Sequence, residues 1–200
     1  MTRRMYICGM TVVCLLSIAA TAQESRSEIS LQGTGFFSKS SSGNGTAYSS
    51  TETGGFLAAY RYHLHRGLSA EIVYGYDHDT QKFAYTSSVF RIQSNIHEAT
   101  GDLVASLPSF VKGRLGPYVL AGVGALVFAP TGSAISGAQT QAKPVFVYGG
   151  GVSYAIHKQV SLRVEYRGLV YGAPDFGLGG LNTNSMTHTA QPSVGLVFHF

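Results

Sequence analysis

Strict alternation of apolar and polar side chains constrains this chain more than any other feature of its sequence. In residues 160–167, one set of alternate positions holds Val160, Leu162, Val164 and Tyr166, and the other holds Ser161, Arg163, Glu165 and Arg167. A β-strand places alternate residues on opposite faces, whereas a helix would mix the two sets. Residues 193–200 repeat the pattern. The sequence therefore predicts strands at both places and favours an all-β structure.

Eight segments show this alternation, some of them weakly. They cover about residues 29–37, 56–63, 68–76, 94–107, 117–128, 145–156, 160–167 and 193–200. Long connections (38–53, 77–91, 130–143 and 172–187) alternate strictly with short ones (65–67, 108–113 and 157–159). Outer-membrane barrels have this asymmetry, because their periplasmic turns are short and their external loops are long. The sequence predicts an eight-stranded antiparallel up-and-down transmembrane β-barrel.

The composition supports a surface that faces lipid. Charged residues make up 12% of the chain and hydrophobic residues 44%. A soluble domain usually has about twice that charged share, and a disordered chain is much less apolar. An apolar belt around a barrel accounts for both values.

The first 22 residues are expected to be a cleaved signal peptide. Arg3 and Arg4 precede an apolar stretch at 7–20, and Ala20-Thr21-Ala22 has the small-x-small pattern of a cleavage site. Residues 23–200 then form one exported barrel domain. Both cysteines lie in the removed segment, so no disulfide is expected. The remaining Lys and Arg residues are scattered, which argues against a nucleic-acid partner.

Seven charged residues lie at positions expected to face the barrel interior, because exposing them to hydrocarbon would cost kilocalories each. They are Arg61, Glu71, Glu98, Asp102, Arg163, Glu165 and Arg167. Three are basic and four acidic, and this near-balance favours mutual pairing in an interior that eight strands leave just wide enough for side chains. The alternative is a set of charges that lines a selective pore or performs acid–base work.

No catalytic, cofactor or metal site is predicted. His63 and His65 share one strand face but lack a third local ligand, and His97 and Glu98 face opposite sides of their strand. The last strand region holds His188, Ser185 and Ser193, the residue types of a lipid A-modifying barrel enzyme. It lacks the tight His-x-Ser spacing expected of a barrel deacylase. The chain is therefore expected not to be an enzyme.

The mature chain resembles the small eight-stranded outer-membrane barrels of the OmpA transmembrane-domain and OmpX-like class. The most specific element is the ending at 194–200, in which Phe198 and Phe200 alternate with Val197 and His199. The resemblance implies that this ending is the signal received by the barrel-assembly machinery, and that both mature termini are periplasmic. Since Trp is absent, an aromatic girdle must come from Tyr and Phe, with Tyr60, Tyr62, Tyr74, Tyr76, Tyr118, Tyr148, Tyr154, Tyr166 and Tyr171 as candidates.

The expected role is structural or interactive, either in envelope stability or in binding through the loops. The expected partners are outer-membrane lipid and lipopolysaccharide, the assembly machinery during biogenesis, and a surface or host ligand at the loops. A narrow channel for ions or small solutes is the main alternative. A lipid A-modifying barrel enzyme and a soluble lipocalin-like barrel are the further ones.

Overall fold

The computed structural model describes residues 26–43, 46–50, 53–85, 88–111, 113–131, 138–178 and 184–200. The expected signal peptide lies outside these residues. The described residues include no helix long and apolar enough to cross a membrane, a finding that concerns helices alone.

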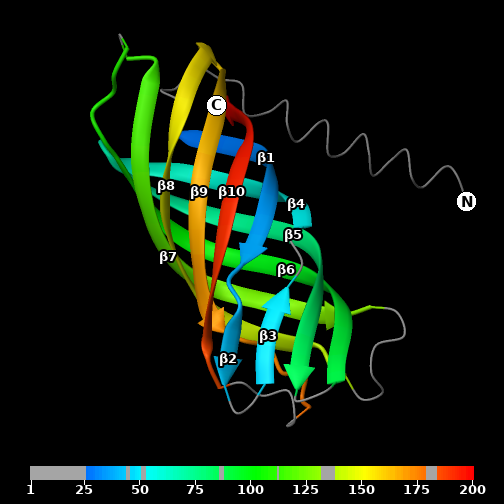
Figure 1. Cartoon of the computed structure of the whole chain (residues 1–200). Helices are drawn as coiled ribbons and strands as arrows, with labels where there is room; N and C mark the ends of the chain where they lie inside the picture. Colours follow the sequence, from blue (N-terminus) through cyan, green and yellow to red (C-terminus); the bar gives the residue numbers. More distant parts are fainter. Residues whose placement is uncertain are drawn as a thin grey trace, which may run out of the picture.

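Eight long antiparallel strands form a closed barrel (Figure 1). They are β1 (Ser27–Ser38), β4 (Thr53–His65), β5 (Leu68–Tyr85), β6 (Ser88–Ser106), β7 (Leu115–Pro130), β8 (Gln141–His157), β9 (Val160–Gly172) and β10 (Met186–His199). Each strand pairs with its neighbour along the chain, and β1 pairs with β10 through Ile29 and Phe198, which closes the sheet. The predicted eight-stranded antiparallel barrel is confirmed.

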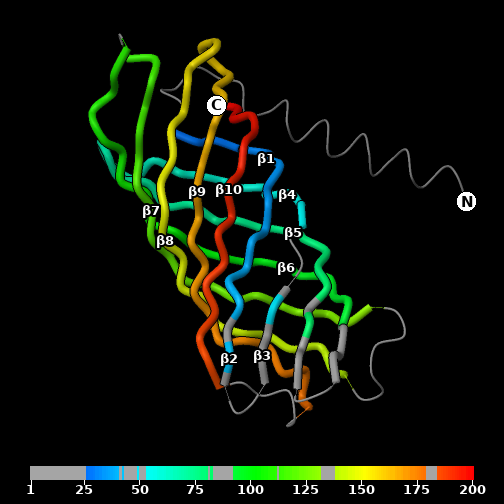
Figure 2. Tube along the Cα trace, viewed as in Figure 1, coloured from blue at the N-terminus to red at the C-terminus, as the bar shows by residue number. Residues whose placement is uncertain are grey.

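The first long connection contains a short hairpin of its own. It consists of β2 (Ser41–Gly43) and β3 (Thr46–Ser50), and β3 pairs with the last residues of β5. Figure 2 shows this hairpin continuing the barrel wall beyond the end of β1.

The loop predicted at 77–91 is wrong. β5 continues to Tyr85 and β6 begins at Ser88, and the two strands stay paired throughout. Similarly, β10 begins at Met186, well before the alternation becomes clear at 193. A strand that extends past the apolar belt keeps its hydrogen-bond ladder but no longer needs an apolar outer face. The sequence pattern therefore stops before the strand does.

The two ends of the barrel differ in their connections. One end, here called the turn end, holds the short connections, including Arg66–Gly67, where Gly67 has φ of 86° and accommodates a tight turn. Both ends of the described chain are also there, because the backbone N–H of Ser27 donates to the carbonyl of Phe200 at 3.2 Å. The opposite end, here called the loop end, holds the three long connections (39–52, 131–140 and 173–185) and the two-residue connection between β5 and β6.

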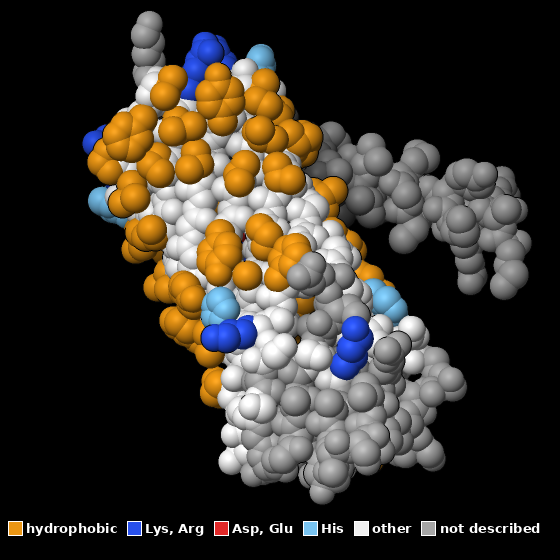
Figure 3. Space-filling view, viewed as in Figure 1, with side chains coloured by type: hydrophobic (Ala, Val, Ile, Leu, Met, Phe, Trp, Pro, Cys, Tyr) orange, Lys and Arg blue, Asp and Glu red, His pale blue; other side chains and the backbone are white. Residues whose placement is uncertain are grey.

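The outer face of the barrel is apolar (Figure 3). Leu31, Ile72 and Val123 are each at least 60% exposed, which suits lipid and not water. Tyr74 and Tyr148 lie on this face, where their hydroxyls contact His97 Nδ1 and His188 Nε2, each at 2.9 Å.

The prediction of an aromatic girdle is wrong for two of the tyrosines, Tyr118 and Tyr171. Tyr118 is only 4% exposed and Tyr171 is fully buried, because both lie at inward-facing positions of their strands. Their hydroxyls instead contact polar groups inside the barrel, Glu165 for Tyr118 and Thr189 for Tyr171.

Candidate functional site: the charged interior

The interior of the barrel contains an ion-pair network that joins strands from opposite walls. The structure places all seven of the charged residues predicted from the sequence on the inner face, where each is at most 4% exposed. The residues that form the network are Glu28, Arg61, Glu71, Glu98, Asp102, Arg163, Glu165 and Arg167.

Arg163 on β9 forms the part of the network nearest the turn end. Its Nη2 lies 2.6 Å from Glu28 Oε2 and its Nη1 lies 3.2 Å from Glu71 Oε2. The same Glu71 oxygen accepts a hydrogen bond from Arg61 Nε at 2.7 Å. Two guanidinium groups therefore share one carboxylate. The Tyr118 ring packs against both, with its centroid 4.5 Å from the Arg61 Cζ and 5.5 Å from that of Arg163.

Arg167 forms the second part of the network, on the same face of β9 and closer to the loop end. Its Nη1 lies 2.7 Å from Asp102 Oδ2, and its Nη2 lies 3.0 Å from Glu98 Oε1. Nη2 also donates to Thr100 Oγ1 at 2.8 Å. These partners are all on β6, which is separated from β9 by β8 and β7 in the sheet. The bonds therefore cross the interior and occupy it.

The interior is richer in acid than the sequence analysis expected. Glu28, Asp77 and Asp79 are also buried, which gives seven buried carboxyl groups against three buried guanidinium groups among the described residues. The predicted near-balance of signs is therefore wrong. The alternation of inward and outward positions could have identified these three residues. Glu28 lies two positions before the inward-facing Ser30, and Asp77 and Asp79 continue the inward set of Glu71 once β5 is extended.

Glu28 contacts two histidines at the turn end of the barrel. Its Oε1 lies 2.8 Å from His63 Nε2 and 3.4 Å from His199 Nδ1. The other ring nitrogens contact the hydroxyls of Ser69 and Ser161, each at 2.8 Å. This connectivity resembles the serine–histidine–carboxylate relay of hydrolases. Both serine hydroxyls belong to buried residues, however.

An apolar layer fills the interior at the loop end. Its members come from five strands and from the segment after β9, and they include Phe36, Ile92, Ile96, Leu126, Phe128, Val145, Val147, Leu169, Tyr171 and Phe176. Phe176 is fully buried and packs edge-on against Phe128, with ring centroids 6.4 Å apart. Asp175 fixes this segment to β8, because its Oδ1 accepts a hydrogen bond from Gln141 Nε2 at 2.7 Å. Nothing in the alternation pattern indicated that this loop segment enters the barrel.

The structure does not bring the histidine and serine candidates of the last strand, His188 and Ser193, together. His97 and His188 lie on the outer face, and the Ser193 hydroxyl points inward, where it donates to Gln32 Oε1 at 3.1 Å. His188 and Ser193 therefore lie on opposite faces of β10. Within the described ranges, no three His, Cys, Asp or Glu side chains are grouped so as to hold a metal ion.

The buried and the exposed charged residues differ in their balance of signs. In the part of the chain that the structure describes, every acidic residue except half-buried Asp175 is buried. The exposed charged residues are all basic: Arg26, Lys39, Arg66, Arg114 and Lys158. Figure 3 accordingly shows Lys and Arg side chains but no acidic ones on the face that it presents.

Comparisons with known proteins agree on the fold. Crystal structures of two outer-membrane proteins are similar to the chain. OprG from Pseudomonas aeruginosa has a TM-score of 0.63 at 12% identity, covering 90% of this chain and 98% of OprG. Neisserial surface protein A has a TM-score of 0.59 at 16% identity, covering 86% of this chain and 97% of that protein. At such identities the likeness shows the fold alone.

No curated protein matches the chain in sequence. The model of the family described as "Outer membrane protein beta-barrel domain" does match, and it covers residues 8–200. This match agrees with the closed barrel and its apolar outer face. The chain belongs to the outer membrane protein beta-barrel domain family and is a β-barrel protein of the bacterial outer membrane.

Proposed function

We propose that this protein is a closed, non-conducting barrel with a structural or surface-interaction role, which stabilises the envelope and presents its loops for binding. One observation supports this proposal above the others: the interior is occupied along its length. Glu28 and the two histidines that it contacts lie at the turn end, the ion pairs of Arg163 and Arg167 cross the middle, and the apolar layer with Phe176 fills the loop end. A water-filled pore needs an open, polar interior, which eight strands rarely leave.

The proposed orientation places the turn end in the periplasm. The short connections and the paired ends Ser27 and Phe200 are at that end, as periplasmic turns are in barrels of this kind. Export would use residues 1–22 as a cleaved signal peptide. The long connections at the loop end would then face the medium, where a surface or host ligand is available, and the apolar belt would contact outer-membrane lipid and lipopolysaccharide.

A narrow channel is the second candidate, and the excess of buried acid is the observation that favours it. Seven buried carboxyl groups against three guanidinium groups would make any water-filled path cation-selective. In this alternative, the segment that holds Phe176 would have to leave the barrel.

Conductance measurements separate these two functions. Purified protein, shown to be folded by heat-modifiable gel migration, is expected to give no steady single-channel current in planar bilayers. The Phe176→Ala variant is also expected to give no steady current, because the ion pairs on the turn-end side of Phe176 still cross the interior. Steady wild-type openings with cation selectivity, altered by Asp77→Asn, would establish the channel instead.

We also propose that Phe198 and Phe200 form the signal for assembly. Both side chains lie on the outer face at the end of the last strand, 48% and 38% exposed, so they contribute little to packing inside the barrel. The double variant Phe198→Ala/Phe200→Ala is expected to refold from urea into detergent about as well as wild type, yet to be largely lost from the outer membrane in cells. The matched control is Ile72→Ala/Val123→Ala, two outward apolar residues on β5 and β7, away from the C-terminal strand. Equal losses in cells for both double variants would contradict the proposal.

A further inference from the structure

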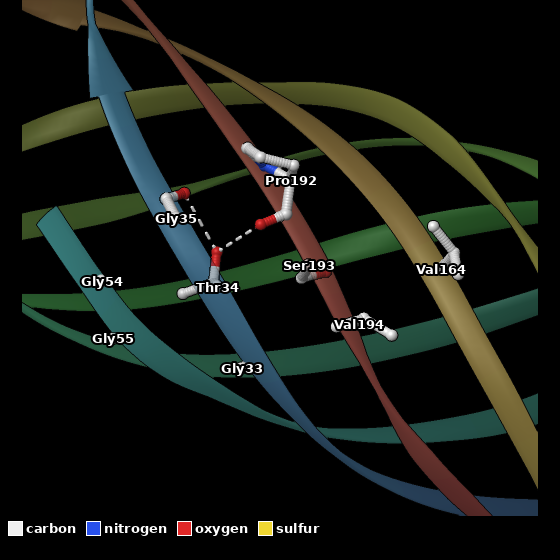
Figure 4. A pocket seen from close by; sticks show the side chains of 9 residues that line it. All are labelled: Gly33, Thr34, Gly35, Gly54, Gly55, Val164, Pro192, Ser193 and Val194. Atoms are coloured by element: carbon white, nitrogen blue, oxygen red, sulfur yellow. Dashed lines mark hydrogen bonds between the residues drawn. The ribbon is translucent and has the colours of Figure 1, made fainter. Parts of the chain in front are cut away.

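A groove interrupts the outer face of the barrel where β1 meets β10. It has a volume of about 660 Å³. Figure 4 shows it at the junction of β4, β1, β10 and β9. Six of its lining residues lie at outward-facing positions: Gly33, Gly35, Gly54, Val164, Pro192 and Val194.

The sequence itself creates this groove. The ladder between β1 and β10 pairs Thr34 with Ser193 and Phe37 with Ala190, but leaves the two positions between them unpaired. Pro192 lies in this gap and has no N–H to donate. The Thr34 hydroxyl donates to the Pro192 carbonyl at 3.0 Å, which holds the two strands together at the gap. The glycines supply no side chains to cover the site, so the wall is thin there.

The chemistry of the lining favours a hydrocarbon chain. No charged residue lines the groove, and its outward-facing members are glycine, valine and proline. The groove opens on the face that carries the exposed Leu31 and Leu196, which contacts lipid and not water. A membrane lipid can place one acyl chain in such a groove and remove its apolar wall from contact with mobile neighbours.

A cation lies on the same strip of wall, towards the loop end. Phe37 is the outward position that follows Gly35 on β1, and Lys39, one residue beyond the end of the strand, is exposed. The backbone N–H of Lys39 donates to the carbonyl of His188 at 2.8 Å, which places the two residues side by side. Four residues of strand span about 13 Å, so a lipid whose chain occupies the groove can bring its headgroup to Lys39.

We infer that this strip is a binding site for lipid A, with one acyl chain in the groove and a phosphate at Lys39. The inference rests on the proposed orientation, since only the outer leaflet would meet the loop end. The exposed cation at Lys39 favours an anionic headgroup over a zwitterionic one. The Tyr148–His188 pair, joined at 2.9 Å, supplies further polar groups beside the phosphate.

Native mass spectrometry of the folded protein in detergent, titrated with bisphosphorylated lipid A, tests this site. The first variant is Gly33→Leu, which adds a side chain to the groove at a position where a Cβ would lie 4.0 Å from the Val194 carbonyl oxygen, its nearest contact on another strand. Its matched control is Gly101→Leu on β6, an outward glycine whose added Cβ would meet no other part of the chain within 4 Å. The second variant is Lys39→Gln, and its control is Lys158→Gln at the turn end.

The apparent Kd for lipid A is expected to rise roughly fivefold in Lys39→Gln and at least as much in Gly33→Leu, and to stay unchanged in both controls. Dephosphorylated lipid A should bind wild type as weakly as intact lipid A binds Lys39→Gln. Wild-type affinity in Gly33→Leu, or equal losses in the controls, would overturn the site. Phosphatidylglycerol that binds as tightly as lipid A, with the same dependence on Gly33 and Lys39, would overturn the assignment to lipid A. A conducting barrel that keeps the expected binding pattern would refute the proposed function and leave the site standing.

Discussion

Replacing Arg167 with methionine is expected to lower the free energy of unfolding by about 3–5 kcal/mol, the usual cost of removing one partner from a buried ion pair. Arg167 is fully buried and contacts Asp102 at 2.7 Å and Glu98 at 3.0 Å, so the variant leaves carboxylates inside the barrel without their cation. Urea titration of the protein in detergent micelles, followed by heat-modifiable gel migration, measures the loss.

A compensated variant separates charge from packing in this experiment. Arg167→Met/Glu98→Gln/Asp102→Asn keeps similar side-chain volumes but removes the unpaired charges, and it should recover most of the lost stability. Arg114→Gln in an exposed turn serves as the control and should change stability by less than about 0.5 kcal/mol. If the single and triple variants are equally unstable, the packing of Arg167 matters and its charge does not.

Gly122→Ala is expected to prevent assembly of the barrel or to reduce its yield severely. A Cβ at Gly122 would overlap the backbone of Gly101 and Asp102 on β6, and the latter Cα would be 2.8 Å away. Rigid backbone cannot move aside as the end of a side chain can, so the cost exceeds that of ordinary overpacking, about 1–3 kcal/mol. The folded fraction after dilution from urea into detergent gives the readout.

The matched control lies on the neighbouring strand. Gly101→Ala adds the same methyl group where no other part of the chain lies within 4 Å, so it should refold like wild type. Since Gly101 and Gly122 belong to paired strands at nearly the same depth, the comparison isolates the close approach of β6 and β7. Normal assembly of Gly122→Ala would show that these strands separate easily.

The sequence predicted the strands that lipid constrains, because one face of each must be apolar there. Val160, Leu162 and Val164 show this rule in β9, and the barrel class followed from it together with the connection lengths. Strand segments outside the lipid do not need an apolar outer face. For this reason β5 continues to Tyr85 and β6 begins at Ser88, inside the range 77–91 where a loop was expected.

The alternation of side chains predicted which residues face the interior, but it did not predict which of them form ion pairs with one another. Alternation placed Arg163, Glu165 and Arg167 on the inward set, yet their partners depend on which side chains meet across the interior. Tyr118 shows the limit: a tyrosine suits both an interface girdle and an interior hydrogen bond, and only the register decides. The burial of Phe176 follows from the packing of a loop, which no strand periodicity describes.

The ion pairs that cross the interior also constrain the order in which the chain can enter a membrane. Arg167 on β9 is separated by 65 and 69 residues from Asp102 and Glu98 on β6, and Arg163 by 135 residues from Glu28 on β1. An inserted intermediate made only of the first strands would hold carboxylates at membrane depth without their arginines, which is costly. We therefore expect β9 and β10 to arrive before the early strands leave the aqueous interface, so that the wall closes and the charges pair in one concerted step.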